Sequence, residues 1–231
     1  MRVQLEPSYI LHSRPYRESS VLLEVLSREH GRIGLIARGA RGARSRWKSI
    51  LQPFRPLLLS WSQRGELGTV TGADQIAAPP ALNGEPLFCA LYANELLVRF
   101  LQRSDPHAGL FDQYRDLLAA LGGGEASQAA LRLFEFHVLT AAGFGLQLDC
   151  ESDSGRELRA DAWYRYEPES GPVAGPPGQG PGQELVSGSA LLALKSGEIG
   201  EEHLRELKLL MRRLIRHYLG DRAIKSQQLF V

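Results

Sequence analysis

The sequence predicts an α+β protein in which a small five-stranded barrel precedes a helical region. Three observations support this prediction. Five short runs with strand character come before Pro79 and Pro80. The apolar spacing becomes helical after these two prolines. The chain has 231 residues, of which 43% are hydrophobic, enough for one large or two small packed domains.

The expected strands lie at 8–13, 20–26, 32–37, 54–61 and 66–76. A turn signal at His30 and Gly31 joins the second and third runs as a hairpin. Pro53 and Pro56 restrict the fourth run to a sheet edge or a strand start. Five short strands favour a closed barrel, because closure removes exposed strand edges. The oligonucleotide-binding (OB) fold is the commonest such barrel, and an SH3-like barrel is the alternative.

The expected helices lie at 86–103, 110–121, 127–142, 189–195 and 201–219. In the first of them Glu95 falls on the apolar face, and Arg99 at i+4 supplies a partner for its charge. Residues 149–187 lack periodicity, and the Gly- and Pro-rich stretch 171–182 is typical of a flexible loop. We therefore expect a barrel domain over 1–80 and a helical domain over 81–231, with an irregular insert at about 149–187.

The formal net charge of +1 hides an asymmetry along the chain. Residues 1–80 hold twelve Lys and Arg against six Asp and Glu, whereas residues 81–231 hold fifteen against twenty. The stretch 30–65 has eight basic residues and no acidic one. This split indicates a polyanion as the partner of the barrel, although a solvated basic face gives the same pattern.

The segment 38–48 is the strongest local signal, with five positive charges, two interior glycines and one tryptophan. Glycine lets a backbone approach a ligand closely, and arginine binds phosphate through two hydrogen bonds. Trp47 is either a platform for base stacking or an anchor in the core. We expect the following residues to bind the phosphate backbone of a nucleic acid: Arg14, Arg17, Arg38, Arg41, Arg44, Arg46 and Lys48.

The last helix carries a second group of cations at spacings of three and four residues, which place them on one face. This secondary basic face consists of Arg205, Lys208, Arg212 and Arg216. The alternative is an ordinary solvated face whose charge is balanced by Glu202 and Glu206.

No motif for covalent catalysis occurs: the chain lacks a P-loop, a Rossmann glycine fingerprint, a nucleophile elbow and a His-Glu-x-x-His sequence. Asp149, Glu151 and Asp153 leave a metal-dependent nuclease open as an alternative. Two cysteines cannot complete a four-cysteine zinc site. We therefore predict no catalytic residue, no metal and no cofactor. Without a signal peptide or a long apolar run, we expect a cytoplasmic protein that does not bind membranes.

Several sequence blocks follow one another in order over almost the whole chain. They read ILHSRPYRESS at 10–20, ARGAR at 37–41, LQPF at 51–54, YANELL at 92–97, LRLFE at 131–135, GFG at 143–145 and KSQQLF at 225–230. This series resembles bacterial RecO proteins, which mediate recombination in the RecFOR repair pathway. The resemblance implies an N-terminal OB fold, a helical domain and a zinc-finger-like insert before the last helices.

The resemblance also implies binding of single- and double-stranded DNA, annealing of complementary strands and partnership with RecR. It further implies binding of the C-terminal tail of the single-stranded-DNA-binding protein (SSB), which helps RecA to load on coated DNA. The resulting prediction is a monomeric, non-enzymatic recombination mediator in the cytoplasm, associated with the nucleoid. An RNA-binding OB-fold protein is the alternative.

The insert departs from the pattern of the family, in which many members carry two Cys-x-x-Cys pairs. The first pair reads Cys150 and Asp153 here, and no second pair follows within 154–187. One thiolate cannot replace a tetrahedral four-ligand site. We therefore expect a member of the zinc-free subgroup, whose insert depends on packing of Trp163, Tyr164 and Tyr166.

An SSB tail ends in acidic and apolar residues with a free carboxylate, so its receptor needs an apolar groove with a cation at the rim. The helix at 127–142 offers Leu131, Phe134 and Val138 as an apolar row, with Arg132 beside it to hold a carboxylate. The earlier helix offers Leu96, Leu97 and Arg99 for an opposite wall. The alternative is that the apolar row belongs to the ordinary core.

Overall fold

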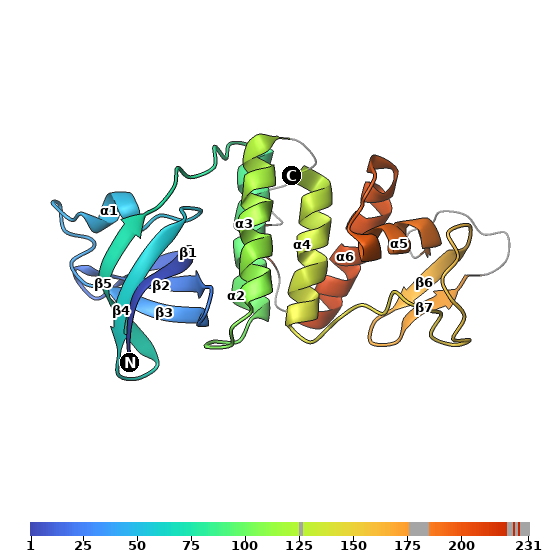
Figure 1. Cartoon of the computed structure of the whole chain (residues 1–231), viewed down its shortest axis with the longest axis horizontal. Coiled ribbons are helices and arrows are strands. Elements are labelled where there is room, and N and C mark those ends of the chain that lie inside the picture. The colour runs from blue at the N-terminus through green and yellow to red at the C-terminus, as the bar shows by residue number, and fades with distance from the viewer. Residues whose placement is uncertain (125–126, 176–184, 221–223, 225, 227–231) are drawn as a thin grey trace. The chain divides into compact units, whose positions relative to one another are not determined.

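The computed structural model in Figure 1 describes residues 1–124, 127–175, 185–220, 224 and 226. The chain forms two compact units, Met1–Glu125 with Ser226–Val231, and Ala126–Lys225. Among the described residues, the first unit contains the barrel, one short helix and two long helices, and the second contains three helices and a small sheet. Residue 80 falls between the barrel strands and helix α2 (Glu85–Phe100), as expected. The predicted domain boundary at this position stays a prediction.

Five strands of the first unit form a closed barrel in the order β1-β2-β3-β5-β4, in which β4 pairs with β1 to complete the circle. Strands β3 and β5 run parallel, and the other neighbours are antiparallel. This closed barrel confirms the predicted OB-fold class. The strands are β1 (Arg2–Tyr16), β2 (Ser20–Ser27), β3 (Gly31–Ala37), β4 (Leu57–Gln63) and β5 (Leu67–Gln75).

Strand β1 is much longer than the predicted run 8–13, because it pairs with both β2 and β4. The pairing register shifts between Val3 and Glu6 and again between Ile10 and His12. Such bulges bend a strand, which lets one strand serve two edges of a closed barrel. The two ends of β1, on either side of the predicted run 8–13, carry no alternating apolar pattern. Sequence periodicity therefore predicted only the middle of this strand.

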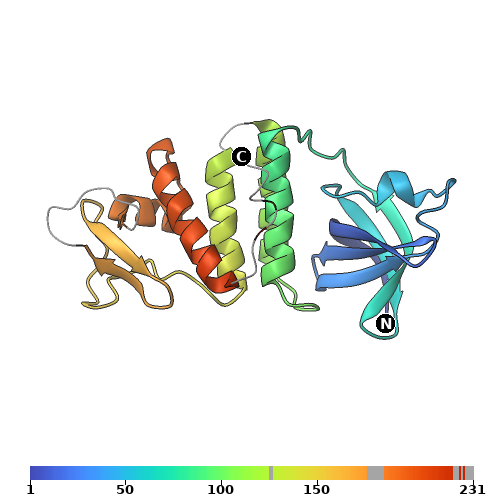
Figure 2. The same ribbon diagram turned by 180° about the vertical axis from the view of Figure 1, so that it is seen from behind.

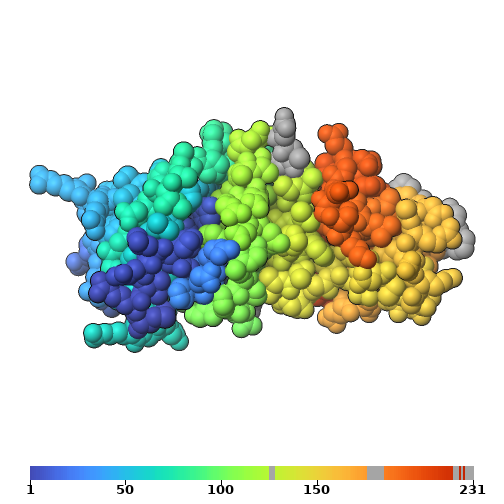
Figure 3. All heavy atoms as spheres, viewed as in Figure 1, coloured from blue at the N-terminus to red at the C-terminus, as the bar shows by residue number. Residues whose placement is uncertain are grey.

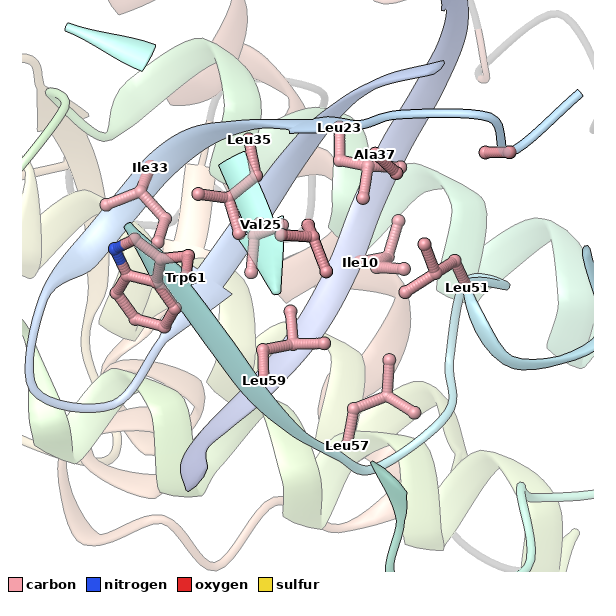
Figure 4. Close-up of a cluster of buried hydrophobic side chains, with 12 residues drawn as sticks. Ile10, Leu23, Val25, Ile33, Leu35, Ala37, Leu51, Leu57, Leu59 and Trp61 are labelled. Atoms are coloured by element: carbon pink, nitrogen blue, oxygen red, sulfur yellow. The ribbon is translucent and has the colours of Figure 1, made fainter. Parts of the chain in front are cut away.

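The barrel is filled by alternating side chains of its strands, as Figure 4 shows. Trp61 is the largest of these side chains and is completely buried. On β2 and β3 the core residues occupy alternate positions, Leu23 and Val25 on β2 and Ile33, Leu35 and Ala37 on β3, as expected for the inner face of a barrel. The fully buried side chains of this core include Ile10, Leu23, Val25, Leu35, Leu57, Leu59 and Trp61.

The fourth strand begins three residues later than predicted, at Leu57 instead of 54. Phe54 adopts a left-handed backbone conformation with φ of 64°, which ends any extended run at that point. A short helix, α1 (Trp47–Ile50), lies in the connection before it and was not predicted. Four residues are too few to show a helical period in the sequence.

Two helices of the first unit, α2 (Glu85–Phe100) and α3 (Ala108–Gly123), are tied to strand β1. Asn94 donates its side-chain N–H to the carbonyl of Leu11 at 2.9 Å, and it accepts a hydrogen bond from the hydroxyl of Tyr114. Burial raises the pKa of Tyr114, which keeps this hydroxyl protonated as the donor. The expected pair of Arg99 and Glu95 is present at 3.3 Å.

In the second unit, α4 (Ser127–Ala141) and α6 (Leu204–Leu219) pack side by side, as Figures 1 and 2 show. Helix α6 buries Leu207, Met211 and Leu214, as its helical spacing predicted. A 3₁₀ turn, η1 (Glu201–His203), precedes α6, and α5 (Gly188–Ser196) packs against both α4 and α6.

The insert is more ordered than the expected irregular loop. It forms a three-stranded sheet in the order β7-β6-β8, from β6 (Trp163–Glu167), β7 (Gly171–Ala174) and β8 (Leu185–Ser187). Tyr164 and Tyr166 are buried, while Trp163 is only half-buried. The prediction of a loop from 171 is therefore wrong for 171–174, and residues 176–184 lie outside the described part. The strands escaped notice because they have three to five residues each.

Candidate nucleic-acid interface

The basic segment 38–48 begins where strand β3 ends and leads into α1. It turns tightly: Gly39 has φ of 67°, Gly42 donates its N–H to the carbonyl of Gly39 at 3.2 Å, and Ser45 donates to Gly42 at 3.1 Å. In Figure 3 this light-blue segment stands out from the surface of the barrel. The turns keep the chain out in solvent, so its arginines are not drawn into the core.

Arg41 fastens this segment to the turn between β1 and β2. Its backbone N–H donates to the carbonyl of Ser19 at 2.9 Å. Its guanidinium donates to the carbonyls of Arg17 and Glu18, both at 3.2 Å. The structure therefore brings the two predicted basic segments, the one around Arg17 and the one from 38 to 48, to the same place on the barrel.

All seven predicted DNA-binding cations are exposed. Within the described part of the chain, none of the seven forms an ion pair with a carboxylate. Exposed cations without carboxylate partners keep their positive potential for a ligand. We name this set the barrel patch: Arg14, Arg17, Arg38, Arg41, Arg44, Arg46 and Lys48.

For Trp47 the structure bears on one of the two alternatives, the anchor in the core, and base stacking stays a prediction. Its side chain is half-buried and packs against the barrel core, as those of Ile50 and Val21 also do. The guanidinium of Arg46 lies over its ring, 4.5 Å from the ring centre. A cation over an aromatic face stabilises both groups and gives the exposed arginine a fixed position.

The secondary basic face also exists in the structure. Arg205, Lys208, Arg212 and Arg216 are all exposed on α6, on the side away from the buried leucines. The carboxylate of Glu206 accepts the backbone N–H of Ser187 at 2.8 Å and, within the described ranges, forms no ion pair with these four cations. Charge balance by Glu202 and Glu206 stays the alternative. Leu209 is exposed on the same helix, 41% of its surface being accessible.

The apolar row of α4 is placed differently from the expected open groove. Leu131, Phe134 and Val138 are each no more than 2% exposed, and Arg132 is 5% exposed. The guanidinium of Arg132 pairs with the carboxylate of Glu135 at 2.9 Å, three residues along the helix. The row is therefore core in this conformation, because its side chains fill the unit and its cation already holds a carboxylate. Binding of an SSB tail at this helix stays a prediction.

Two of the three acidic residues that left a metal site open have partners in the structure. Asp149 pairs with Lys195 at 2.7 Å. Glu151 accepts hydrogen bonds from Ser154 and, at 3.2 Å, from Arg156, and these contacts lower the pKa of Glu151. Among the described residues, no three His, Cys, Asp or Glu side chains gather as metal ligands.

Sequence reasoning missed a pocket of about 340 Å³ next to the barrel patch. Its lining combines residues of β1, β2 and the segment after β3, which are distant in the sequence. No local pattern reveals such a pocket, since it depends on how three segments meet.

No helix in the described ranges combines the length and apolar character needed to cross a lipid bilayer.

Comparison with known proteins identifies the family. The family model described as Recombination protein O N terminal matches residues 1–79, and the model described as Recombination protein O C terminal matches residues 82–228. A relative called DNA repair protein RecO, from Methylococcus capsulatus, is 46% identical over 230 residues, covering 99% of this chain and 93% of the relative. Proteins of the same name from Nitrosococcus oceani and Coxiella burnetii are 46% and 39% identical, each over 99% of this chain and over 93% and 98% of the relative. The chain belongs to the RecO family.

Proposed function

We propose that this member of a DNA repair family acts as a recombination mediator without catalysing a covalent step. It binds single- and double-stranded DNA, anneals complementary strands, and associates with RecR and the SSB tail so that RecA can load on coated DNA. The observation that carries the proposal is the barrel patch, seven exposed cations on an OB-fold barrel that form no ion pair with any carboxylate in the part of the chain that the structure describes. Contacts of this kind favour phosphate over base edges and so suit binding without sequence preference.

Annealing requires two negatively charged strands to meet on one protein. A single basic surface binds one backbone, and the second strand is then repelled unless another cation group neutralises it. The secondary basic face on α6 is the second surface in this proposal. Its four exposed cations follow one helix, a geometry that suits a phosphate backbone and needs no base contact.

Charge reversal in the barrel patch tests the DNA-binding step. Arg38→Glu together with Arg44→Glu is the informative variant, because Arg41 also holds the segment in place and its loss disturbs the fold. We expect weaker binding and a salt dependence reduced by about 0.7 in log–log slope for each lost phosphate contact on a single strand.

The matched control is Arg2→Glu together with Arg64→Glu, which changes the net charge equally. Both residues are exposed, and they lie where the start of β1 meets the end of β4. The control should keep the wild-type salt slope. Equal slopes for the wild type and the barrel-patch variant would remove the patch from the DNA site.

Annealing is tested with Arg212→Glu and Arg216→Glu on α6. The rate of annealing of two complementary oligonucleotides should fall, while binding of one labelled strand to the barrel persists. The neutral pair Arg212→Gln and Arg216→Gln should lie between this variant and the wild type. Unchanged annealing by the charge-reversed variant would exclude α6 as the second surface.

Tail binding at α4 requires the tail carboxylate to replace Glu135 as the partner of Arg132, because the two are already paired. Arg132→Lys keeps the positive charge but gives up the forked guanidinium geometry. Calorimetry with an SSB tail peptide should show weaker binding by this variant, with DNA annealing unchanged. Equal affinities would place the tail elsewhere on the protein.

A further inference from the structure

A pocket of about 340 Å³ lies beside the barrel patch. Its floor is apolar and includes Leu23, Ala40 and Leu51, which are all buried. Arg41 and Lys48 line it as exposed cations, and Trp47 forms an aromatic part of the wall. The pocket therefore combines an apolar interior, one aromatic ring and two positive charges.

The walls of this pocket are fixed by the fold. Trp47 packs against the barrel core on one side and carries the guanidinium of Arg46 at 4.5 Å over its ring. Arg41 is held by two backbone carbonyls of the β1–β2 turn. The side chain of Gln52 donates to the carbonyl of Lys48 at 2.6 Å. A wall built in this way requires little ordering when a ligand enters.

We propose that this pocket receives one unpaired nucleobase of a single strand, while the cations around it hold the adjacent phosphates. The proposal rests on DNA binding by the barrel patch and adds a base-binding position to it. A flat base has apolar faces that suit the floor, and it stacks on the ring of Trp47 in place of the exposed Arg46 guanidinium that lies there in the free protein. The anionic phosphates on either side of the base suit Arg41 and Lys48. An apolar peptide would satisfy the floor but would leave both cations without a counter-charge.

A base-binding pocket makes the barrel bind a single strand more tightly than a duplex. A base in a duplex is stacked and paired, so entry into the pocket would first cost the energy of flipping it out. A base in a single strand is free to enter. Stacking on an aromatic side chain tolerates every base, so this position adds affinity without reading sequence.

The experiment compares two labelled strands of equal length and charge, an oligothymidine and an abasic phosphodiester. Binding of the abasic strand measures phosphate contact alone. The wild type should bind oligothymidine at least about fivefold more tightly, the lower limit expected from stacking of one base. Ser13→Leu narrows the pocket at an exposed strand position and should bring the ratio of affinities close to one, with abasic-strand binding unchanged.

The matched control is Ser62→Leu, a change of the same type at an exposed position of β4 in the same barrel. It should keep the wild-type ratio. As a second measurement, oligothymidine should quench tryptophan emission in the wild type and much less in Trp47→Phe. Of the other two tryptophans, Trp61 is completely buried and Trp163 belongs to the insert in the second unit, so Trp163→Phe should keep the wild-type quenching. This measurement does not depend on the folding of the serine variant.

Two results would overturn the proposal in distinguishable ways. Equal binding of the two strands by the wild type, with no quenching that depends on Trp47, would leave the barrel patch as a phosphate site and reject the base pocket. Failure to bind either strand at low salt would reject DNA binding by the barrel patch and the pocket with it.

Discussion

Two groups of arginines on the same barrel differ in what they can bind. On β3, Arg32 is held by Glu24 at 2.8 Å and by the carbonyl of Leu101 at 3.0 Å, and Arg103 shares the same carboxylate. In the barrel patch, Arg38 and its neighbours have no such carboxylate among the described residues. The residue type is the same in both groups. The difference teaches that the tertiary partner decides whether an arginine supports the fold or remains available to a polyanion.

The surroundings of the two groups explain this difference. The chain between α2 and α3 lies directly against the β3 group: a Cβ on Gly31 would lie 2.0 Å from the carbonyl oxygen of Asp105. A Cβ on Gly34 would likewise lie 3.3 Å from a guanidinium nitrogen of Arg103. A Cβ on Gly39, in the barrel patch, would meet nothing within 4 Å. Close packing thus brings a carboxylate to one group, whereas in the other no described carboxylate forms an ion pair with the exposed arginines.

The largest effect expected from this comparison is on Arg132, whose pairing is the most buried. Arg132→Ala removes the guanidinium from beside Glu135, whose side chain is 1% exposed. Breaking a buried ion pair in this way should lower the free energy of unfolding by about 3 kcal/mol or more. Urea denaturation measures it, with the exposed Arg205→Ala as control, which should change stability by less than about 0.5 kcal/mol. A loss as small as that of the control would show that the buried pair adds nothing to stability.

The next effect concerns the β3 group. Glu24→Gln leaves Arg32 and Arg103 with a neutral partner, and Arg32 is 15% exposed. We expect a loss of about 2 kcal/mol, within the range for hydrogen bonds to charged groups. The control is Glu18→Gln, an exposed carboxylate in the β1–β2 turn. Thermal unfolding distinguishes the two variants, and equal melting temperatures would contradict the structural role given to Glu24.

The comparison is sharpest when one arginine of each group is made neutral. Arg38→Gln should change stability by less than about 0.5 kcal/mol, because an exposed side chain without partners supports nothing in the fold. It should nevertheless reduce the salt slope of single-strand binding by about 0.7. Arg103→Gln should do the reverse, lowering stability and leaving the slope unchanged. The distinction fails if Arg103→Gln reduces the slope as much as Arg38→Gln does.

The smallest effect is expected from metal chelation. Asp149 forms an ion pair with Lys195, and Glu151 forms one with Arg156, so both carboxylates already have cationic partners within the protein. We expect that a chelator leaves the melting temperature unchanged and that elemental analysis finds no stoichiometric zinc. Near-equimolar zinc in the purified protein would contradict this expectation and would direct attention to Cys150.

Much of the fold follows from local patterns. Two runs of strand character, 20–26 and 32–37, joined by the turn signal at His30 and Gly31, located β2 and β3, and helical spacing after Leu204 located the buried face of α6. The pair of Glu95 and Arg99 was also predictable, because the two residues are one helical turn apart. Short elements escaped: α1 and the three strands of the insert are too short for a period to appear.

By itself, the sequence determined the fold class, the family and the accumulation of cations in 38–48, since these depend on composition and on residues close together in the chain. Only the tertiary structure decided which charges are engaged. It closed the barrel by pairing β1 with β4, placed Arg132 against Glu135 in the core, and joined Arg41 to the turn at Arg17. It also formed the pocket next to Trp47 from three distant segments. The physical reason is that periodicity reports which face of an element is apolar, whereas the partner of a charge depends on which distant segment packs against it.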